Sequence, residues 1–180
     1  MHLLLFINSL ESGGAERVLA KLANHWAEQD YQVTLATIVP TITDHYPLDS
    51  RVQRVSIDSR GVSRNQLDAA LLNLRRYVRL RKLVRSVQPD CVLAFMPVAN
   101  LLAYAACAGQ SIPVIMSERS HPPNFPMHPP RPWLLRRLYP KATKLVVLTE
   151  DSAEWCRHEL RCDNVTVIPN GVSLPLPSPE

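Results

Sequence analysis

Short apolar runs alternate with amphipathic stretches along almost the whole chain, and this alternation constrains the fold more than any other feature. The apolar runs are too short for buried helices and are predicted as strands over residues 2–7, 32–39, 52–57, 90–96, 114–116, 144–148 and 165–168. Apolar residues at helical spacing between them predict helices over 15–28, 65–87, 98–109, 132–139 and 150–160. Continuous apolar strands separated by helices are typical of an α/β domain with a parallel sheet.

The predicted fold class is therefore α/β, with a single doubly wound, mostly parallel, Rossmann-like sheet covered by helices on both faces. In such sheets ligands bind beyond the carboxyl-terminal ends of the strands, near the switch in strand order. The loops expected at that edge span residues 8–14, 97–100, 117–121 and 149–152.

Two adjacent glycines, Gly13 and Gly14, lie between the first predicted strand and the first predicted helix. A glycine turn at a helix N-terminus gathers unpaired N–H groups and the positive end of the helix dipole, which suits an anion such as phosphate. A tight turn with close helix–strand packing explains the same two residues. This stretch alone leaves both interpretations open.

The charge balance favours anionic partners. The chain of 180 residues has a net charge of +4 and a pI near 9.0. This mildly basic balance suits nucleotide diphosphates, lipid phosphates or an acidic membrane surface, and nothing in it indicates nucleic acid.

Cysteine usage and apolar run length indicate where the protein works. Its four cysteines form no CxxC pair and no metal pattern with the six histidines. No apolar run approaches the roughly 18 residues needed to span a bilayer, and no signal peptide is recognised. We therefore expect no metal and a reducing cytoplasmic location.

The predicted helix over 65–87 carries apolar residues on two nearly opposite faces. Leu67, Leu71, Leu74 and Val78 share one face, and a second apolar set lies further along the helix. The helix is expected either to bend or to project past the sheet. A basic band beside these faces contains Arg75, Arg76, Arg79 and Lys82. This band is interpreted either as a solvated helix face or as a contact for phosphate or membrane.

Prolines are concentrated in two places, residues 122–140 and 169–179. The second cluster excludes both a helix and an inner strand. We therefore expect a domain over residues 1–170, followed by the start of a linker over 171–180 within a longer protein.

Several nucleotide-binding sites are excluded by the motifs. The glycine pair has no third glycine and no acidic residue ends the second strand, so an NAD site is not predicted. No lysine follows a glycine-rich turn, which excludes a P-loop, and no nucleophile elbow is present.

Five motifs together resemble the family-4 retaining glycosyltransferases. The first runs from Ser9 to Arg17 (S-L-x-x-G-G-A-E-R) and the last, V-I-P-N-G-V, from Val167 to Val172. The runs over 90–95, 114–120 and 144–149 follow the same order. The resemblance covers essentially all of the chain.

This resemblance implies the N-terminal half of a GT-B fold, in which two Rossmann domains face each other across a cleft. The N-terminal domain of such enzymes binds the acceptor, and the C-terminal domain binds the nucleotide sugar. By this resemblance the chain is an acceptor-binding domain that is inactive as a transferase without its C-terminal partner domain. No cofactor or metal is implied, and the donor is expected to be a UDP-linked sugar. The implied mechanism retains configuration, because the leaving diphosphate takes the acceptor proton on the same face.

The resemblance also implies roles for individual residues. Gly13 and Gly14 would face the donor diphosphate. Many relatives carry a histidine after the fifth strand, whereas this chain has Glu118 there and His121 three residues later. Glu118 is therefore a candidate catalytic residue, with a structural ion pair as its alternative. His121 is a second candidate or simply a loop histidine.

Four residues are candidates for acceptor binding: Arg119, Ser120, Arg75 and Arg79. The acceptor is expected to be a glycan or a polyprenyl-diphosphate-linked glycan, bound on the inner face of the membrane with the protein attached peripherally. Two other functions remain open: a non-catalytic α/β module that binds a ligand or a partner, and half of a sugar-nucleotide epimerase.

Overall fold

The computed structural model describes residues 1–57, 66–120 and 131–171. Within these ranges one sheet of seven strands has the order β3-β2-β1-β4-β5-β6-β7, and all neighbouring strands are parallel. The strands are β1 (His2–Ile7), β2 (Gln32–Thr37), β3 (Val52–Ser56), β4 (Cys91–Phe95), β5 (Val114–Ser117), β6 (Lys144–Val147) and β7 (Val165–Val167). The predicted doubly wound sheet is confirmed, and it is entirely parallel rather than mostly so.

The helices are α1 (Gly14–Glu28), α2 (Gln66–Val87), α3 (Pro97–Cys107), α4 (Arg131–Leu138) and α5 (Glu150–Leu160). Two 3-10 helices, η1 (Thr41–Thr43) and η3 (Tyr139–Lys141), precede β3 and β6. The predicted helix over 98–109 ends early, because Gly109 takes a positive φ of 77° two residues beyond α3.

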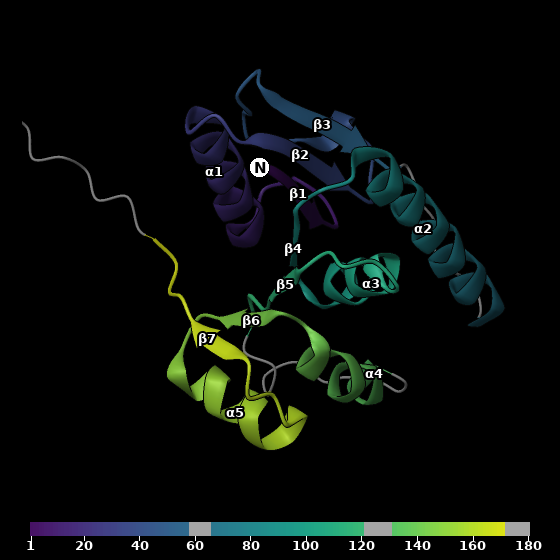
Figure 1. Cartoon of the computed structure of the whole chain (residues 1–180), viewed down its shortest axis with the longest axis vertical. Helices are drawn as coiled ribbons and strands as arrows, with labels where there is room; N and C mark the ends of the chain where they lie inside the picture. Colours follow the sequence, from purple (N-terminus) through teal and green to yellow (C-terminus); the bar gives the residue numbers. More distant parts are fainter. Residues whose placement is uncertain (58–65, 121–130, 172–180) are drawn as a thin grey trace, which may run out of the picture.

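Period-2 alternation divides the side chains of β1 between two apolar clusters, one on each face of the sheet. Leu3, Leu5 and Ile7 of β1 pack with α1 on one face, whereas Leu4 and Phe6 pack with the helices of the other face. That second face is covered by α2, α3, α4 and α5 (Figure 1).

Helix cover is therefore unequal. α1 packs over β1, β2 and β3, and no described helix covers the same face of β5 and β6. Leu93, Ile115 and Val146, which point to that face, are only half-buried. Within the described residues, the expectation of helices on both faces is met at β1, β2 and β3 and is not met at β5 and β6.

Helix α2 explains the two apolar faces predicted over 65–87. Leu80 and Val84 are fully buried against the sheet side, whereas Leu67, Leu71, Leu74 and Val78 are 77%, 56%, 55% and 54% exposed. The helix is continuous, and its end nearer residue 66 extends away from the sheet (Figure 1). Projection, one of the two expected solutions, is the one that the structure adopts.

Candidate functional site

The switch in strand order lies between β1 and β4, the central neighbours of the sheet. The chain builds β1, β2 and β3 in one direction and then returns to add β4 to β7 in the other. The loops that follow β1 and β4 therefore lead away from each other beyond the carboxyl-terminal ends of these two strands. Sheets of this kind bind ligands in the crevice between such loops. The residues that border it come from the glycine turn, from the start of α3 and from the segment after β5.

The glycine turn is held by Tyr46. The Gly13 N–H donates to the Tyr46 hydroxyl oxygen at 3.2 Å, and this hydroxyl donates to the Gly13 carbonyl at 2.9 Å. Gly14 is exposed, and a β-carbon added there would meet no atom within 4 Å. Gly13 thus has its N–H engaged, and Gly14 is the more accessible of the two residues predicted to face a diphosphate.

The loop that carries Tyr46 is fixed by a charged pair. Arg54 donates to both carboxylate oxygens of Asp44 at 2.7 and 2.8 Å, and both side chains are less than one-fifth exposed. Arg54 also donates to the Thr37 hydroxyl at 2.7 Å, which ties the loop to the end of β2. The contact between Tyr46 and Gly13 could not be predicted from the sequence, because the two residues are 33 positions apart.

Glu118 follows β5 and is 2% exposed. Its Oε2 accepts a hydrogen bond from the Tyr139 hydroxyl at 3.0 Å, and its Oε1 accepts one from the Ser120 hydroxyl at 2.7 Å. Tyr139 in turn accepts a hydrogen bond from Asn100 Nδ2 at 3.1 Å. Burial, and then the neighbouring Glu118, raise the pKa of Tyr139 well above its ordinary value.

The Arg119 side chain lies on the side of the segment after β5 that is opposite to Glu118. Its guanidinium lies 4.8 Å from the centre of the Phe95 ring, and it donates to the side-chain oxygens of Ser117 and Asn170. Burial lowers the pKa of Arg119. The structure therefore brings Glu118, Arg119 and Ser120 together at the carboxyl end of β5, whereas His121 lies outside the described residues.

Arg75 and Arg79 lie elsewhere. Arg79 donates to the carbonyl of Ile57, directly after β3, at 2.7 Å. A surface groove of about 380 Å³ lies there, lined by Val55, Ser56, Ile57, Arg79, Lys82, Leu83 and Ser86. β3 is an edge strand, and β2, β1 and β4 separate it from β5. The predicted acceptor residues thus form two groups rather than one.

The start of α3 contributes a strained residue to this edge. Met96 has φ 77° and ψ 148°, a conformation that costs a non-glycine residue about 1–3 kcal/mol. Its N–H donates to the Ser117 carbonyl at 3.0 Å, and its carbonyl accepts from the Asn100 N–H at 2.9 Å. This bend connects the end of β4 to the segment that carries Glu118.

The model of Glycosyltransferase Family 4 matches residues 12–175. The chain belongs to this family. Among curated proteins, it is 29% identical over 150 residues to the GalNAc-alpha-(1->4)-GalNAc-alpha-(1->3)-diNAcBac-PP-undecaprenol alpha-1,4-N-acetyl-D-galactosaminyltransferase of Campylobacter jejuni. That match covers 82% of this chain and 40% of the relative.

Solved structures support the GT-B half-fold. Sucrose-phosphate synthase from Thermosynechococcus elongatus matches 96% of this chain with a TM-score of 0.77 at 10% identity, over 49% of its own chain. An Anabaena protein solved with UDP matches 96% of this chain with a TM-score of 0.65 at 16% identity, over 44% of its own. This family-4 glycosyltransferase chain therefore spans less than half the length of the Campylobacter, Thermosynechococcus and Anabaena proteins.

Two residues that support this site, Tyr46 and Tyr139, were not predicted from the sequence, and Asn100 was expected only as part of the loop over 97–100. None belongs to one of the quoted motifs, and Tyr139 could be interpreted only as an apolar position of a short helix. Within the described ranges, no group of three His, Cys, Asp or Glu side chains could hold a metal ion, and no helix is long and apolar enough to cross a membrane.

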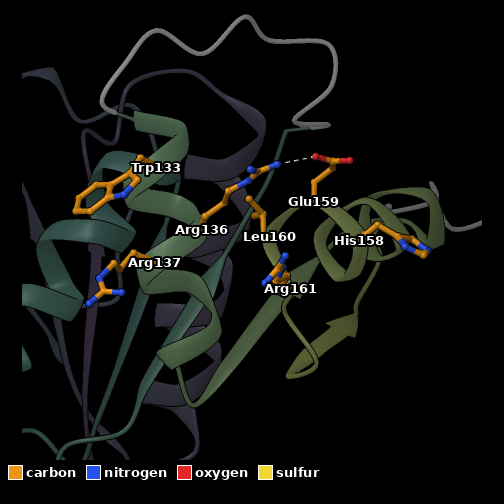
Figure 2. A pocket seen from close by; sticks show the side chains of 7 residues that line it. All are labelled: Trp133, Arg136, Arg137, His158, Glu159, Leu160 and Arg161. Carbon is orange, nitrogen blue, oxygen red and sulfur yellow. Dashed lines mark hydrogen bonds and ion pairs between the residues drawn. The ribbon is translucent and has the colours of Figure 1, made fainter.

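A second groove, of about 490 Å³, lies between α4 and α5 (Figure 2). Its lining includes Trp133, Arg136, Arg137, Glu159 and Arg161. An ion pair of 2.8 Å between Arg136 and Glu159 bridges the two helices across it. This groove holds none of the predicted site residues.

Proposed function

We propose that this chain is the acceptor-binding half of a retaining glycosyltransferase. The enzyme transfers a sugar from a UDP-linked donor to a glycan carried on a polyprenyl diphosphate. Family membership supports the transferase reaction. The Campylobacter relative is named for an acceptor on PP-undecaprenol, and the Anabaena neighbour was solved with UDP.

The exposed face of α2 is the observation that supports a lipid-linked acceptor. Four apolar side chains, from Leu67 to Val78, are each more than half exposed along one stripe. Arg75 lies beside this stripe on the same helix and is exposed, and the groove next to β3 adds Arg79. Apolar side chains flanked by arginines suit the boundary between acyl chains and anionic headgroups. The same arrangement suits a lipid-linked diphosphate.

In the proposed reaction the donor half lies outside these 180 residues and places the nucleotide sugar opposite the carboxyl-terminal edge of this sheet. The N–H group of the exposed Gly14 and the guanidinium of Arg119 then stabilise the negative charge of the leaving diphosphate or of the acceptor phosphate. The leaving diphosphate takes the acceptor proton, so the domain supplies positioning and electrostatics and needs no metal or organic cofactor. The reaction takes place on the cytoplasmic face of the membrane, with the protein attached peripherally.

Product analysis tests the reaction. The full-length protein is mixed with a UDP-sugar and a polyprenyl-diphosphate-linked glycan, and UDP release and the anomeric configuration of the product are measured. Transfer with retention is expected. An inverted product, or UDP-sugar converted into an epimer without transfer, contradicts the proposal.

Vesicle binding tests the membrane contact separately. We expect the 180-residue chain to sediment with phosphatidylglycerol-containing vesicles, and the variant Leu71→Ser/Leu74→Ser to lose most of this binding. The control Ile42→Ser removes an apolar side chain that is 87% exposed on η1, outside α2. Equal loss in both variants, or binding insensitive to either, contradicts the assignment to α2.

A further inference from the structure

Arg119 is a partly desolvated cation that forms no ion pair within the described residues. It is half-buried, its guanidinium lies on the Phe95 ring, and its Nε is buried without an acceptor. Its two side-chain hydrogen bonds go to neutral oxygens, and no ion pair joins it to a carboxylate of the described residues. A charge withdrawn from water without a counter-charge is costly, so an anionic ligand is the natural partner of this guanidinium.

The position of Arg119 follows from strand alternation. The Glu118 N–H donates to the Val146 carbonyl at 2.8 Å, which continues the β5–β6 pairing one residue past the strand. Glu118 therefore points to the same face as Met116, beneath the helices, and Arg119 points to the opposite face above Phe95. Whatever holds Glu118 in place thereby also sets the direction of Arg119.

Glu118 is held by three groups of the chain. The Tyr139 hydroxyl donates to one carboxylate oxygen at 3.0 Å, and the hydroxyl and N–H of Ser120 donate to the other at 2.7 and 3.3 Å. The two bonds from Ser120 close a turn around Arg119, so they restrict the backbone on both sides of it.

The contacts continue from Glu118 into the core. Tyr139 is 1% exposed and Asn100 is fully buried. Asn100 Nδ2 donates to the Tyr139 hydroxyl oxygen at 3.1 Å and to the Ser117 carbonyl at 3.2 Å. One buried chain of hydrogen bonds thus joins the first turn of α3, the end of β5 and η3. Asn100 Oδ1 is buried without a partner, and loss of either Nδ2 hydrogen bond would leave further buried polar groups unpaired. This cost keeps the hydrogen-bonded members in one arrangement.

We propose that Glu118, Tyr139 and Asn100 are positioning residues that hold the Arg119 guanidinium at the carboxyl-terminal edge of the sheet, where it binds a phosphate group of the substrate. Glu118 then acts through Arg119 and does not touch the reacting atoms. The nature of that substrate rests on the function proposed above, whereas phosphate binding by Arg119 can be measured without it.

The probe is inorganic pyrophosphate, titrated into the 180-residue chain and followed through the arginine Nε–H resonances in NMR spectra. Loss of one resonance in Arg119→Lys assigns it to Arg119. We expect this resonance to shift saturably with pyrophosphate. Arg119→Ala should weaken binding by about tenfold or more, as expected for a charge-assisted hydrogen bond.

The positioning role is tested by Tyr139→Phe, which removes only a hydroxyl. Pyrophosphate affinity should fall by about three- to tenfold, and the Arg119 resonance of the free protein should move. Tyr104→Phe on α3 is the matched control, because the same atom is removed from a half-buried tyrosine outside the network. Glu118→Gln, which keeps one acceptor oxygen, should retain more affinity than Glu118→Ala.

Each result has a distinct meaning. Absence of saturable pyrophosphate binding, or an unchanged affinity in Arg119→Ala, overturns phosphate binding by Arg119. A Tyr139→Phe variant that has lower thermal stability but wild-type pyrophosphate affinity overturns the positioning role and assigns the network to stability alone. Neither result decides whether the full-length protein transfers a sugar, because transfer is assayed separately. Failure of phosphate binding by Arg119 is therefore distinguishable from failure of the proposed transferase activity.

Discussion

At the scale of single residues, hydroxyl groups at long sequence separation organise this site. The Tyr46 hydroxyl forms hydrogen bonds with both the N–H and the carbonyl of Gly13, and the Tyr139 hydroxyl donates a hydrogen bond to Glu118. A phenol suits both places because it donates and accepts at the end of a long apolar side chain. Tyr46 thereby connects its own loop to the glycine turn, and Tyr139 connects the segment after β5 to the core.

The buried hydroxyl of Tyr139 predicts a pH effect. Burial and Glu118 raise its pKa in the folded chain above the unfolded value of about 10. The neutral form is therefore favoured by folding, and its stabilising contribution is complete below pH 10 and is lost as pH rises from there toward the folded pKa.

We expect the free energy of unfolding to fall more steeply above pH 10 in the wild type than in Tyr139→Phe, as measured by urea denaturation. Tyrosinate absorbance of the folded proteins should rise equally in the two near pH 10, because Tyr139 stays protonated there. A larger rise in the wild type contradicts the prediction.

At the scale of elements, α2 combines two functions in one helix. Its second half anchors the domain through fully buried Leu80 and Val84, while its first half exposes an apolar stripe. Stability and the proposed membrane contact are thus assigned to different residues of the same helix, so they can be altered independently.

Alanine substitutions along α2 should separate these roles. Leu80→Ala is expected to cost about 2–5 kcal/mol of unfolding free energy, because it leaves a cavity in the core. Leu74→Ala, at a side chain that is 55% exposed, should change it by less than about 0.5 kcal/mol. Urea denaturation followed by circular dichroism measures both, and equal costs contradict the assignment.

Helix α5 begins with a side-chain cap. Thr149 Oγ1 accepts a hydrogen bond from the Ser152 N–H at 3.2 Å. Thr149→Ala should lower the unfolding free energy by about 1 kcal/mol, and Thr149→Ser should restore most of it. Thermal denaturation of the three proteins provides the comparison; an Ala variant as stable as the wild type excludes the cap as a stabilising contact.

At the scale of the whole molecule, sheets of this kind bind ligands at their carboxyl-terminal edge. Within the described residues, this edge carries the glycine turn, Met96 and Arg119. The relatives are longer proteins, and this chain matches 40% of one and 49% of another. A nucleotide sugar bound to these residues alone would keep much of its surface in water.

We therefore expect the 180-residue chain to bind a UDP-sugar weakly or undetectably by isothermal titration calorimetry. Burying only part of a ligand recovers little of the free energy that association costs. The matched variant is Gly14→Val, which adds a side chain at the open position of the glycine turn. Micromolar affinity that disappears in Gly14→Val would show that the domain holds the nucleotide without a second domain.

Local patterns determined much of this protein. Short apolar runs and helical periodicity predicted the strands, the helices and the parallel sheet, because each depends on neighbours within a few positions. The glycine pair and the end motifs likewise indicated the family and the ligand-binding edge. The sequence also showed that the apolar residues of α2 lie on two nearly opposite faces. It did not show whether the helix bends or projects past the sheet.

Tertiary structure alone decided which side chains meet. Tyr46 with Gly13, Tyr139 with Glu118, and Arg119 with Phe95 are contacts between residues 21 or more positions apart. It also decided that Arg79 and Arg119 lie at different strands of the sheet. The physical reason is that strand order sets these distances, and strand order results from packing the whole sheet between its helices rather than from any local pattern.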